Sequence, residues 1–186
     1  MVEVQSPNSR AARGILGRMR GTPLYSAVAM LLARRVRVHG DSMHPLLEPG
    51  DRVLFDRLAY RWESPRRGDL VLVERPAEPA GNLIKLIAGL PSEQIAVALD
   101  RLWVDGQLVA FPGPMVGSLP GRWTLGTDEY FVLSYAVAVG QDSRQFGPVG
   151  RAAITARAWM VYAPSARRRR LAGIELPLES PAGRAR

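Results

Sequence analysis

The sequence has no cysteine, only two histidines, and one lysine among its 25 basic residues. Without cysteine there is no disulfide, no thiolate nucleophile and no cysteine-ligated zinc, and cysteine usage cannot indicate a redox compartment. His39 and His44 are too few for a histidine-rich metal site, and only these two could serve a Ser-His-Asp triad. We therefore expect no metal and no cofactor.

The sequence also lacks an apolar run long enough for an ordinary transmembrane helix. The run at residues 24–33 is followed at once by Arg34 and Arg35. At about 1.5 Å per residue, such a helix covers only about half of a hydrocarbon core of about 30 Å. Cleavage of a secretory signal requires a small-x-small motif after the apolar run, and no such motif follows here. We expect a short helix that is interfacial or docked on the protein, or else a segment packed in the core.

The net charge of +8 is concentrated at the two ends of the chain. Residues 1–37 carry a net +6 and residues 166–186 a net +4, whereas residues 38–165 carry −2. A chain of 186 residues is long enough for one domain with a sizeable core. We predict a basic, flexible lead with a short helix at 1–35, a folded domain at 36–164 and a basic, disordered tail at 165–186. Both ends could contact an anionic membrane or nucleic acid.

From residue 36 onward the sequence has short β-branched runs separated by turn residues. Asp105-Gly106 predicts a tight hairpin turn between two such runs at residues 102–109, because both residues accept positive φ angles. No internal repeat or alternation of helix and strand is present. The fold class is therefore all-β, with several small sheets rather than a sandwich. The other predicted strands are residues 36–39, 52–55, 70–74, 83–88, 94–98, 130–133 and 158–162.

Lys85 is the only lysine in the sequence, and the other 24 basic residues counted with it are arginines. Arginine cannot act as a base because its pKa is above about 12, whereas a desolvated lysine can be neutral near pH 7. The residues around Lys85 are apolar, which disfavours the ammonium form. Lys85 is a candidate general base; the alternative is a surface lysine retained by chance.

Ser42 is the candidate nucleophile for that base. It lies between a predicted strand and a turn, after Gly40, which we expect to allow close backbone approach, and before Pro45, which stiffens the chain. Its own N–H is then a candidate oxyanion donor. His44 is a rival base, but two residues from Ser42 on the same stretch it is poorly placed to face the hydroxyl.

Four segments, in this order, resemble the conserved boxes of type I signal peptidases. The spacing of 43 residues from Ser42 to Lys85 also matches, and the resemblance extends over about residues 36–163. The four segments are GDSMHPLLEPGD (40–51), RGDLV (67–71), IKLIAGLPSE (84–93), and DSR (142–144) with FGPV (146–149).

The resemblance implies a fold of several small antiparallel sheets and a serine endopeptidase in which Lys85 takes the proton of Ser42. An acyl-enzyme would form and be hydrolysed. It implies preprotein signal or leader peptides as partners, small residues at the first and third positions before the cut, and no nucleic acid. The supporting site residues that it implies are Gly40, Met43, Asp142, Ser143 and Arg144.

This chain departs from the family pattern at several positions. A family serine that contacts the lysine corresponds to Gly140, and the family's Gly-Asp-Asn corresponds to residues 134–136, which read Ser-Tyr-Ala. Leu86 replaces a frequent arginine that pairs with the lost aspartate, so we expect local repacking. With Gly40 in place of a side-chain oxyanion donor, we expect fewer hydrogen bonds to the lysine and the oxyanion.

The absence of an obvious transmembrane anchor leaves the location open. We expect a peripheral or weakly anchored protein of the bacterial plasma membrane, with an extracytoplasmic active site; the alternative is cytoplasmic. Other functions to weigh are a soluble maturation protease of the nickel superoxide dismutase type and an inactive relative that binds lipid or nucleic acid. Self-cleaving repressors carry a DNA-binding domain, which residues 1–35 are too short to supply.

Overall fold

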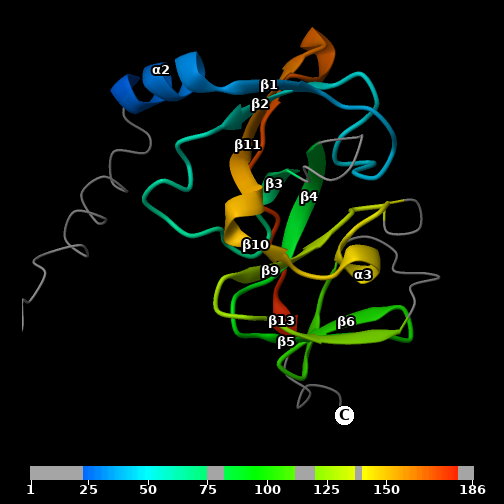
Figure 1. Cartoon of the computed structure of the whole chain (residues 1–186). Helices are drawn as coiled ribbons and strands as arrows, with labels where there is room; N and C mark the ends of the chain where they lie inside the picture. The colour runs from blue at the N-terminus through cyan, green and yellow to red at the C-terminus, as the bar shows by residue number, and fades with distance from the viewer. Residues whose placement is uncertain (1–22, 75–81, 112–119, 137–139, 180–186) are drawn as a thin grey trace, which may run out of the picture.

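The computed structural model describes residues 23–74, 82–111, 120–136 and 140–179. These residues form two antiparallel sheets, with the larger sheet in the upper part of Figure 1 and the smaller one below it. The larger sheet has the order β1-β2-β11-β3-β4-β9-β10, with β12 paired to β11, and the smaller has the order β13-β7-β6-β5-β8. The all-β prediction is confirmed.

The elements of the larger sheet are β1 (Arg34–Arg37), β2 (Arg52–Asp56), β3 (Leu70–Glu74), β4 (Asn82–Gly89), β9 (Glu129–Leu133), β10 (Val149–Gly150), β11 (Ile154–Ala163) and β12 (Arg169–Arg170). Those of the smaller sheet are β5 (Gln94–Ala98), β6 (Arg101–Val104), β7 (Gln107–Val109), β8 (Gly121–Thr124) and β13 (Leu178–Glu179). The helical elements are α2 (Pro23–Leu32), α3 (Ser143–Phe146) and the 3₁₀ turns η1 (Arg151–Ala153) and η2 (Ser165–Arg167).

Buried apolar residues join the two sheets and support the turn after β1. Leu86 and Phe131 of the larger sheet pack in one cluster with Ile95 of the smaller sheet. A second cluster, on β2, β3 and β11, takes in Met43 and Leu47 from the segment that carries Ser42. The sheets are thus one packed unit, and the Ser42 segment is fixed to the larger sheet by its own apolar side chains.

Strand positions agree with the sequence analysis in the middle of the chain. The predicted strands 70–74 and 94–98 are β3 and β5, and Asp105 and Gly106 have φ angles of 49° and 75° in the turn between β6 and β7. Two strands begin two or more residues earlier than predicted. β11 begins at Ile154, and β1 begins at Arg34, a residue that we had placed in the flexible lead. As an outer strand paired only with β2, β1 can turn Arg35 and Arg37 to solvent, while half-buried Arg34 pairs with Glu74.

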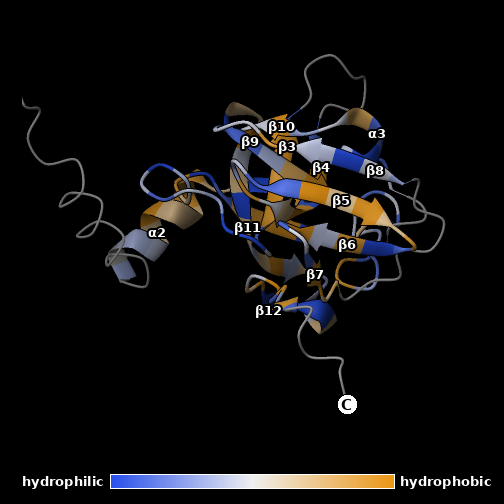
Figure 2. Cartoon of the chain, turned by 90° about the horizontal axis from the view of Figure 1, so that it is seen from below, coloured by the Kyte–Doolittle hydropathy of each residue, from blue (hydrophilic) through white to orange (hydrophobic). Residues whose placement is uncertain are grey.

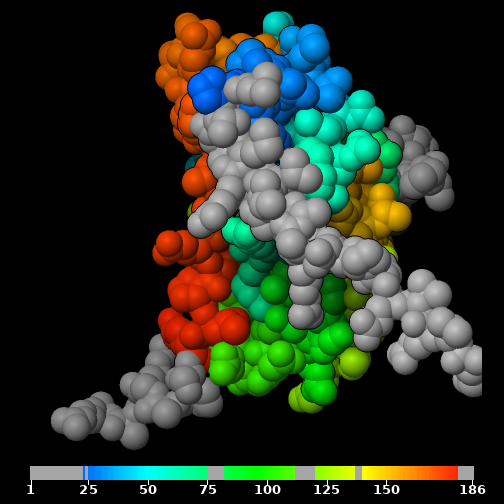
Figure 3. Space-filling model, turned by 90° about the vertical axis from the view of Figure 1, so that its left-hand side faces the viewer, coloured from blue at the N-terminus to red at the C-terminus, as the bar shows by residue number. Residues whose placement is uncertain are grey.

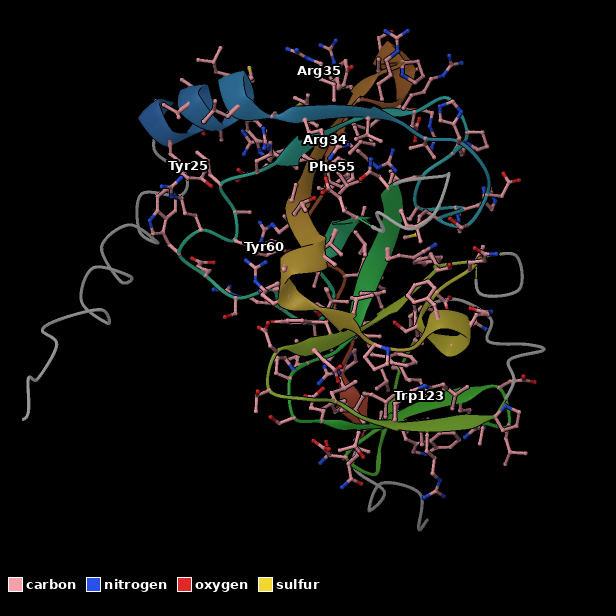
Figure 4. All side chains as sticks on the ribbon, viewed as in Figure 1. Tyr25, Arg34, Arg35, Phe55, Tyr60 and Trp123 are labelled. Carbon is pink, nitrogen blue, oxygen red and sulfur yellow. The ribbon has the colours of Figure 1, made fainter. Side chains whose placement is uncertain are left out.

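The predicted helix at 24–33 is α2, and it is docked rather than packed in the core. Tyr25 donates a hydrogen bond to Asp56 Oδ2 at 2.6 Å, and Ala29 is buried. On the opposite side, Leu31 is 83% exposed. Figure 2 shows α2 standing out from the sheets, and Figure 4 shows Tyr25 on the side that faces the chain after β2. Among the residues that the structure describes, no helix combines the length and hydropathy needed to cross a membrane.

The tail that we predicted to be disordered from residue 165 is ordered as far as Glu179. β12 pairs with β11 of the larger sheet, and β13 pairs with β7 of the smaller sheet. Between them the Ile174 N–H donates to the Gly68 carbonyl at 2.8 Å, and Leu176 is buried. Figure 3 shows this red segment running along one side of the molecule down to the green strands. The prediction failed because the backbone pairing and the burial of Leu171 and Leu176 stabilise an ordered segment despite its basic composition.

Candidate active site

Ser42 lies half-buried in a turn between β1 and β2. Met43 is buried beside it, and the Leu47 N–H donates to the Met43 carbonyl at 2.8 Å. The buried side chains of Met43 and Leu47 and this hydrogen bond hold the turn in place. Gly40 has φ +84°, and a Cβ added there would meet nothing within 4 Å. Our reason for Gly40 was therefore wrong: the glycine is needed for a left-handed backbone and not for close backbone approach.

Lys85 is in the middle of the larger sheet, on β4 between β3 and β9. Its side chain is only 2% exposed. Burial lowers the pKa of Lys85 from 10.5 to about 8; the charge of Asp142 opposes this shift, and the charge of Arg144 adds to it. A lysine with this pKa is neutral in about a tenth of the molecules at pH 7 and in about half at pH 8, so a neutral amine is present to act as a general base.

Ser134 is the hydrogen-bond partner of Lys85. Lys85 Nζ and Ser134 Oγ are 3.0 Å apart, and both side chains are buried. Ser134 directly follows β9, in which Leu133 is paired with Leu86, so Ser134 comes opposite Lys85 in the continued register. No sequence motif indicated Ser134, and we expected the lysine to have lost its hydroxyl partner with the change to Gly140. That expectation was wrong, because Ser134 supplies the hydroxyl.

Gly140 connects this pair of residues to Ser42. A Cβ built on Gly140 would lie 1.9 Å from Ser134 Oγ and 3.2 Å from Ser42 Cβ. The Ala136 N–H donates to the Ser42 carbonyl at 2.9 Å, which holds the segment after Ser134 against the Ser42 turn. The structure thus gathers Ser42, Lys85 and Ser134 around one glycine, although 43 residues separate Ser42 from Lys85 in the chain.

Asp142 organises the side of the site next to Lys85. Its buried carboxylate accepts two hydrogen bonds from the Arg144 guanidinium, at 2.8 and 2.9 Å, and one from the Ser134 N–H at 2.9 Å. It also caps α3 by accepting from the Arg144 N–H. Ser143 Oγ accepts from the Val132 N–H at 2.9 Å and so ties α3 to β9. Asp142 and Arg144 thus form a structural ion pair that holds the Ser134 backbone and sets the charge near Lys85.

The remaining sequence candidates fall outside this cluster. His44 is exposed on the turn, unlike the buried Lys85, and the rival histidine base gains no support from its position. Leu86 is fully buried in the cluster that joins the two sheets, and Tyr135 packs at the edge of the second cluster. Apolar and aromatic packing at these two positions agrees with the repacking expected where a charged pair is absent.

A family model described as signal peptidase, peptidase S26, matches residues 21–163. The chain belongs to this family. As an S26 signal peptidase it is a serine-type endopeptidase. The match includes α2 and ends before the C-terminal segment that connects the two sheets.

Individual relatives are similar to this chain at moderate identity. Signal peptidase I V of Bacillus subtilis is 30% identical over 68% of this chain and 88% of its own length. Signal peptidase I of Pseudomonas aeruginosa is 34% identical over 59% of this chain but only 40% of its own length. A mitochondrial inner membrane protease subunit, 1b, of Arabidopsis thaliana is 31% identical over 67% of each chain.

Proposed function

We propose that this S26 peptidase removes N-terminal signal or leader peptides, with Ser42 as nucleophile and Lys85 as general base. The observation that carries the proposal is the burial of Lys85, which lowers its pKa to about 8 in the neighbourhood that also holds Ser42. Burying a charged lysine that has no carboxylate bonded to it lowers the stability of the fold, so its presence at this position favours a role for the neutral amine. The relatives named signal peptidase supply the substrate class.

In the proposed reaction Ser42 Oγ attacks the carbonyl carbon of the scissile peptide while its proton passes to Lys85 Nζ. The resulting tetrahedral oxyanion accepts a hydrogen bond from the Ser42 N–H. The Lys85 ammonium then returns the proton to the leaving amine as the C–N bond breaks, which leaves an ester on Ser42. Water, deprotonated by Lys85, attacks that ester and releases the leader peptide with its new carboxylate.

The proposed substrate is an extended peptide with alanine or another small residue at the first and third positions before the cut. This specificity comes from the resemblance to the family. An extended peptide can pair its backbone with strands at the site, and its alternate side chains then point into the same surface.

We further propose peripheral membrane contact through α2. Val28, Leu31 and Leu32 are exposed at the i, i+3 and i+4 spacing that places them on one face of the helix. Arg35 and Arg37 of β1 follow with exposed side chains. An apolar helix face beside arginines suits an anionic bilayer surface. The alternative is a soluble maturation protease that acts on one specific leader peptide. Such a protease needs neither the apolar helix face nor the arginines beside it.

The test of the function is cleavage of an exported preprotein with an Ala-x-Ala site by the purified chain. Mass spectrometry of both products locates the cut, and the Ser42→Ala protein is the control. We expect one cut after the second alanine and none with Ser42→Ala. A second preprotein with a bulky residue in place of that alanine should resist cleavage. Cleavage of both preproteins alike, or cleavage that survives Ser42→Ala, would refute the proposal.

A further inference from the structure

The hydroxyl that Lys85 meets is held from two directions. The backbone of Ser134 continues the β9 register with β4, and its N–H donates to Asp142 Oδ2 at 2.9 Å. Its Oγ lies 3.0 Å from Lys85 Nζ, and both residues are at most 2% exposed. Lysine has a flexible four-carbon stem, so a buried acceptor at a fixed position restricts where its nitrogen can lie.

The volume that holds this hydroxyl is available because residue 140 is glycine. A Cβ on Gly140 would lie 1.9 Å from Ser134 Oγ and 2.4 Å from Ser134 Cβ, closer than real atoms approach. Gly140 is not among the glycines with positive φ, so its backbone could accept a side chain. The glycine is therefore required by space, and the space that it leaves is filled by Ser134.

Positions 134 and 140 compete for one site between Lys85 and Ser42. The Cβ that overlaps the Ser134 hydroxyl would also press on Ser42 Cβ at 3.2 Å. A hydroxyl carried by residue 140 would thus reach the place now taken by the one on Ser134. Only one of the two residues can carry it. In the family pattern the serine corresponds to residue 140 and a glycine to residue 134, the reverse of this chain.

We propose that Ser134 is the positioning residue of Lys85 and that Ser134 and Gly140 are an exchanged pair, in which the hydroxyl comes from the end of β9 instead of from the segment before α3. The inference rests on the proposed roles of Ser42 and Lys85. Ser134 holds the Lys85 nitrogen in place and forms no bond with substrate. The other charged groups near Lys85 are Asp142 and Arg144, both at the start of α3, and they keep their mutual ion pair whichever residue carries the hydroxyl.

Ser134→Ala removes one oxygen atom and is the least disruptive test. We expect kcat for a signal-peptide substrate to fall by roughly tenfold to a hundredfold, since a misplaced catalytic group costs about that much. KM should change little. The acid limb of the pH–rate profile should move to lower pH, because an oxygen that accepts from the ammonium is lost. A purely structural role would lower the melting temperature and leave that limb in place.

The exchange itself is tested with two double variants in the Ser134→Gly background. Ser134→Gly/Gly140→Ser moves the hydroxyl to the other segment and should recover kcat to within roughly tenfold of the original protein. Ser134→Gly/Gly140→Ala restores the bulk without the oxygen and should stay as low as Ser134→Gly. Equal recovery with alanine would overturn the proposal, since bulk would then be the cause.

The single variants separate this inference from the proposed dyad. Ser42→Ala and Lys85→Met are assayed beside Ser134→Ala, with circular dichroism to confirm that each is folded. Activity that survives Lys85→Met contradicts the dyad itself. Loss of activity in Lys85→Met, together with an unchanged rate and pH profile in Ser134→Ala, contradicts only the role of Ser134.

Discussion

Val71 of β3 lies directly opposite Lys85 of β4 in the antiparallel register. Val71 is fully buried, and the strand on the other side of β4 is β9, which is buried along most of its length. Adjacent residues on a strand point to opposite faces, so Leu86 and Ile84 do not surround the lysine as their proximity in sequence suggests. Its low pKa results from its central place in the sheet.

The first prediction is that activity follows the deprotonation of Lys85. Because only the neutral amine accepts the Ser42 proton, kcat/KM should rise about tenfold per pH unit in the acid range and level off near the Lys85 pKa of about 8. The measurement uses a peptide without titratable groups near the cut. A pH–rate profile that levels off only near pH 10.5, the ordinary pKa of lysine, would show that burial does not lower the pKa of Lys85.

The second prediction concerns folding stability at alkaline pH. The pKa of Lys85 is lowered in the folded state, so between about pH 8 and 10.5 the unfolded chain binds a proton that the folded chain does not. The free energy of unfolding contributed by this group therefore rises with pH across that window, by roughly 3 kcal/mol at most at about 1.36 kcal/mol per pKa unit.

The control for this measurement is Lys85→Met, which removes the titrating group and keeps an apolar stem of similar length. Urea unfolding of both proteins at several pH values isolates the lysine contribution, because the other groups cancel in the difference. A difference that is constant from pH 7 to 11 would contradict a lowered Lys85 pKa.

The third prediction is that Leu31 contributes to binding of anionic vesicles. Leu31→Ser should weaken co-sedimentation at low salt, because a side chain that is 83% exposed has no packing role to lose. Leu99→Ser, at an 87% exposed leucine next to the smaller sheet, is the matched control and should bind normally. Salt at about 1 M, where the Debye length is about 3 Å, should release the original protein. Equal binding by both variants would place the contact elsewhere.

The fourth prediction is that the C-terminal segment contributes to stability. Leu176 is 7% exposed in the cluster that joins the two sheets, so Leu176→Ala should lower the free energy of unfolding by about 2–4 kcal/mol. Leu178→Ala, two residues later at a 40% exposed position, should cost less than about 1 kcal/mol. Denaturant unfolding gives both values. Comparable losses, or none, would mean that the segment is not packed as described.

The sequence predicted those parts of the fold that have a local pattern. The apolar runs at β3 and β5 and the Asp105-Gly106 turn carry their conformation in adjacent residues, and they were placed correctly. β12 and β13 have two residues each, and β12 consists of arginines. Such strands form because β3 leaves the end of β11 at Met160 and Val161 unpaired and β7 has a free edge, and no pattern within β12 or β13 could indicate this.

The candidate site was predictable to a similar extent. Lys85 stood out because its residue type is unique in the chain, and Ser42 because the segment around it is distinctive. Ser134 lies 49 residues from Lys85, in a stretch with no motif of its own, and its contact depends on the register between β4 and β9. The space that Gly140 leaves for it depends on tertiary packing, which the sequence does not display.

The dyad of Ser42 and Lys85 is the central claim, and the cleavage rate of Lys85→Met tests it most directly. Methionine fits the buried site and cannot accept a proton, so the protein should melt cooperatively while preprotein cleavage falls by roughly a hundredfold to ten-thousandfold. The cleavage rate of Ser42→Ala should fall by at least the same factor. A folded Lys85→Met protein that cleaves the preprotein at a rate near that of the original would contradict the account.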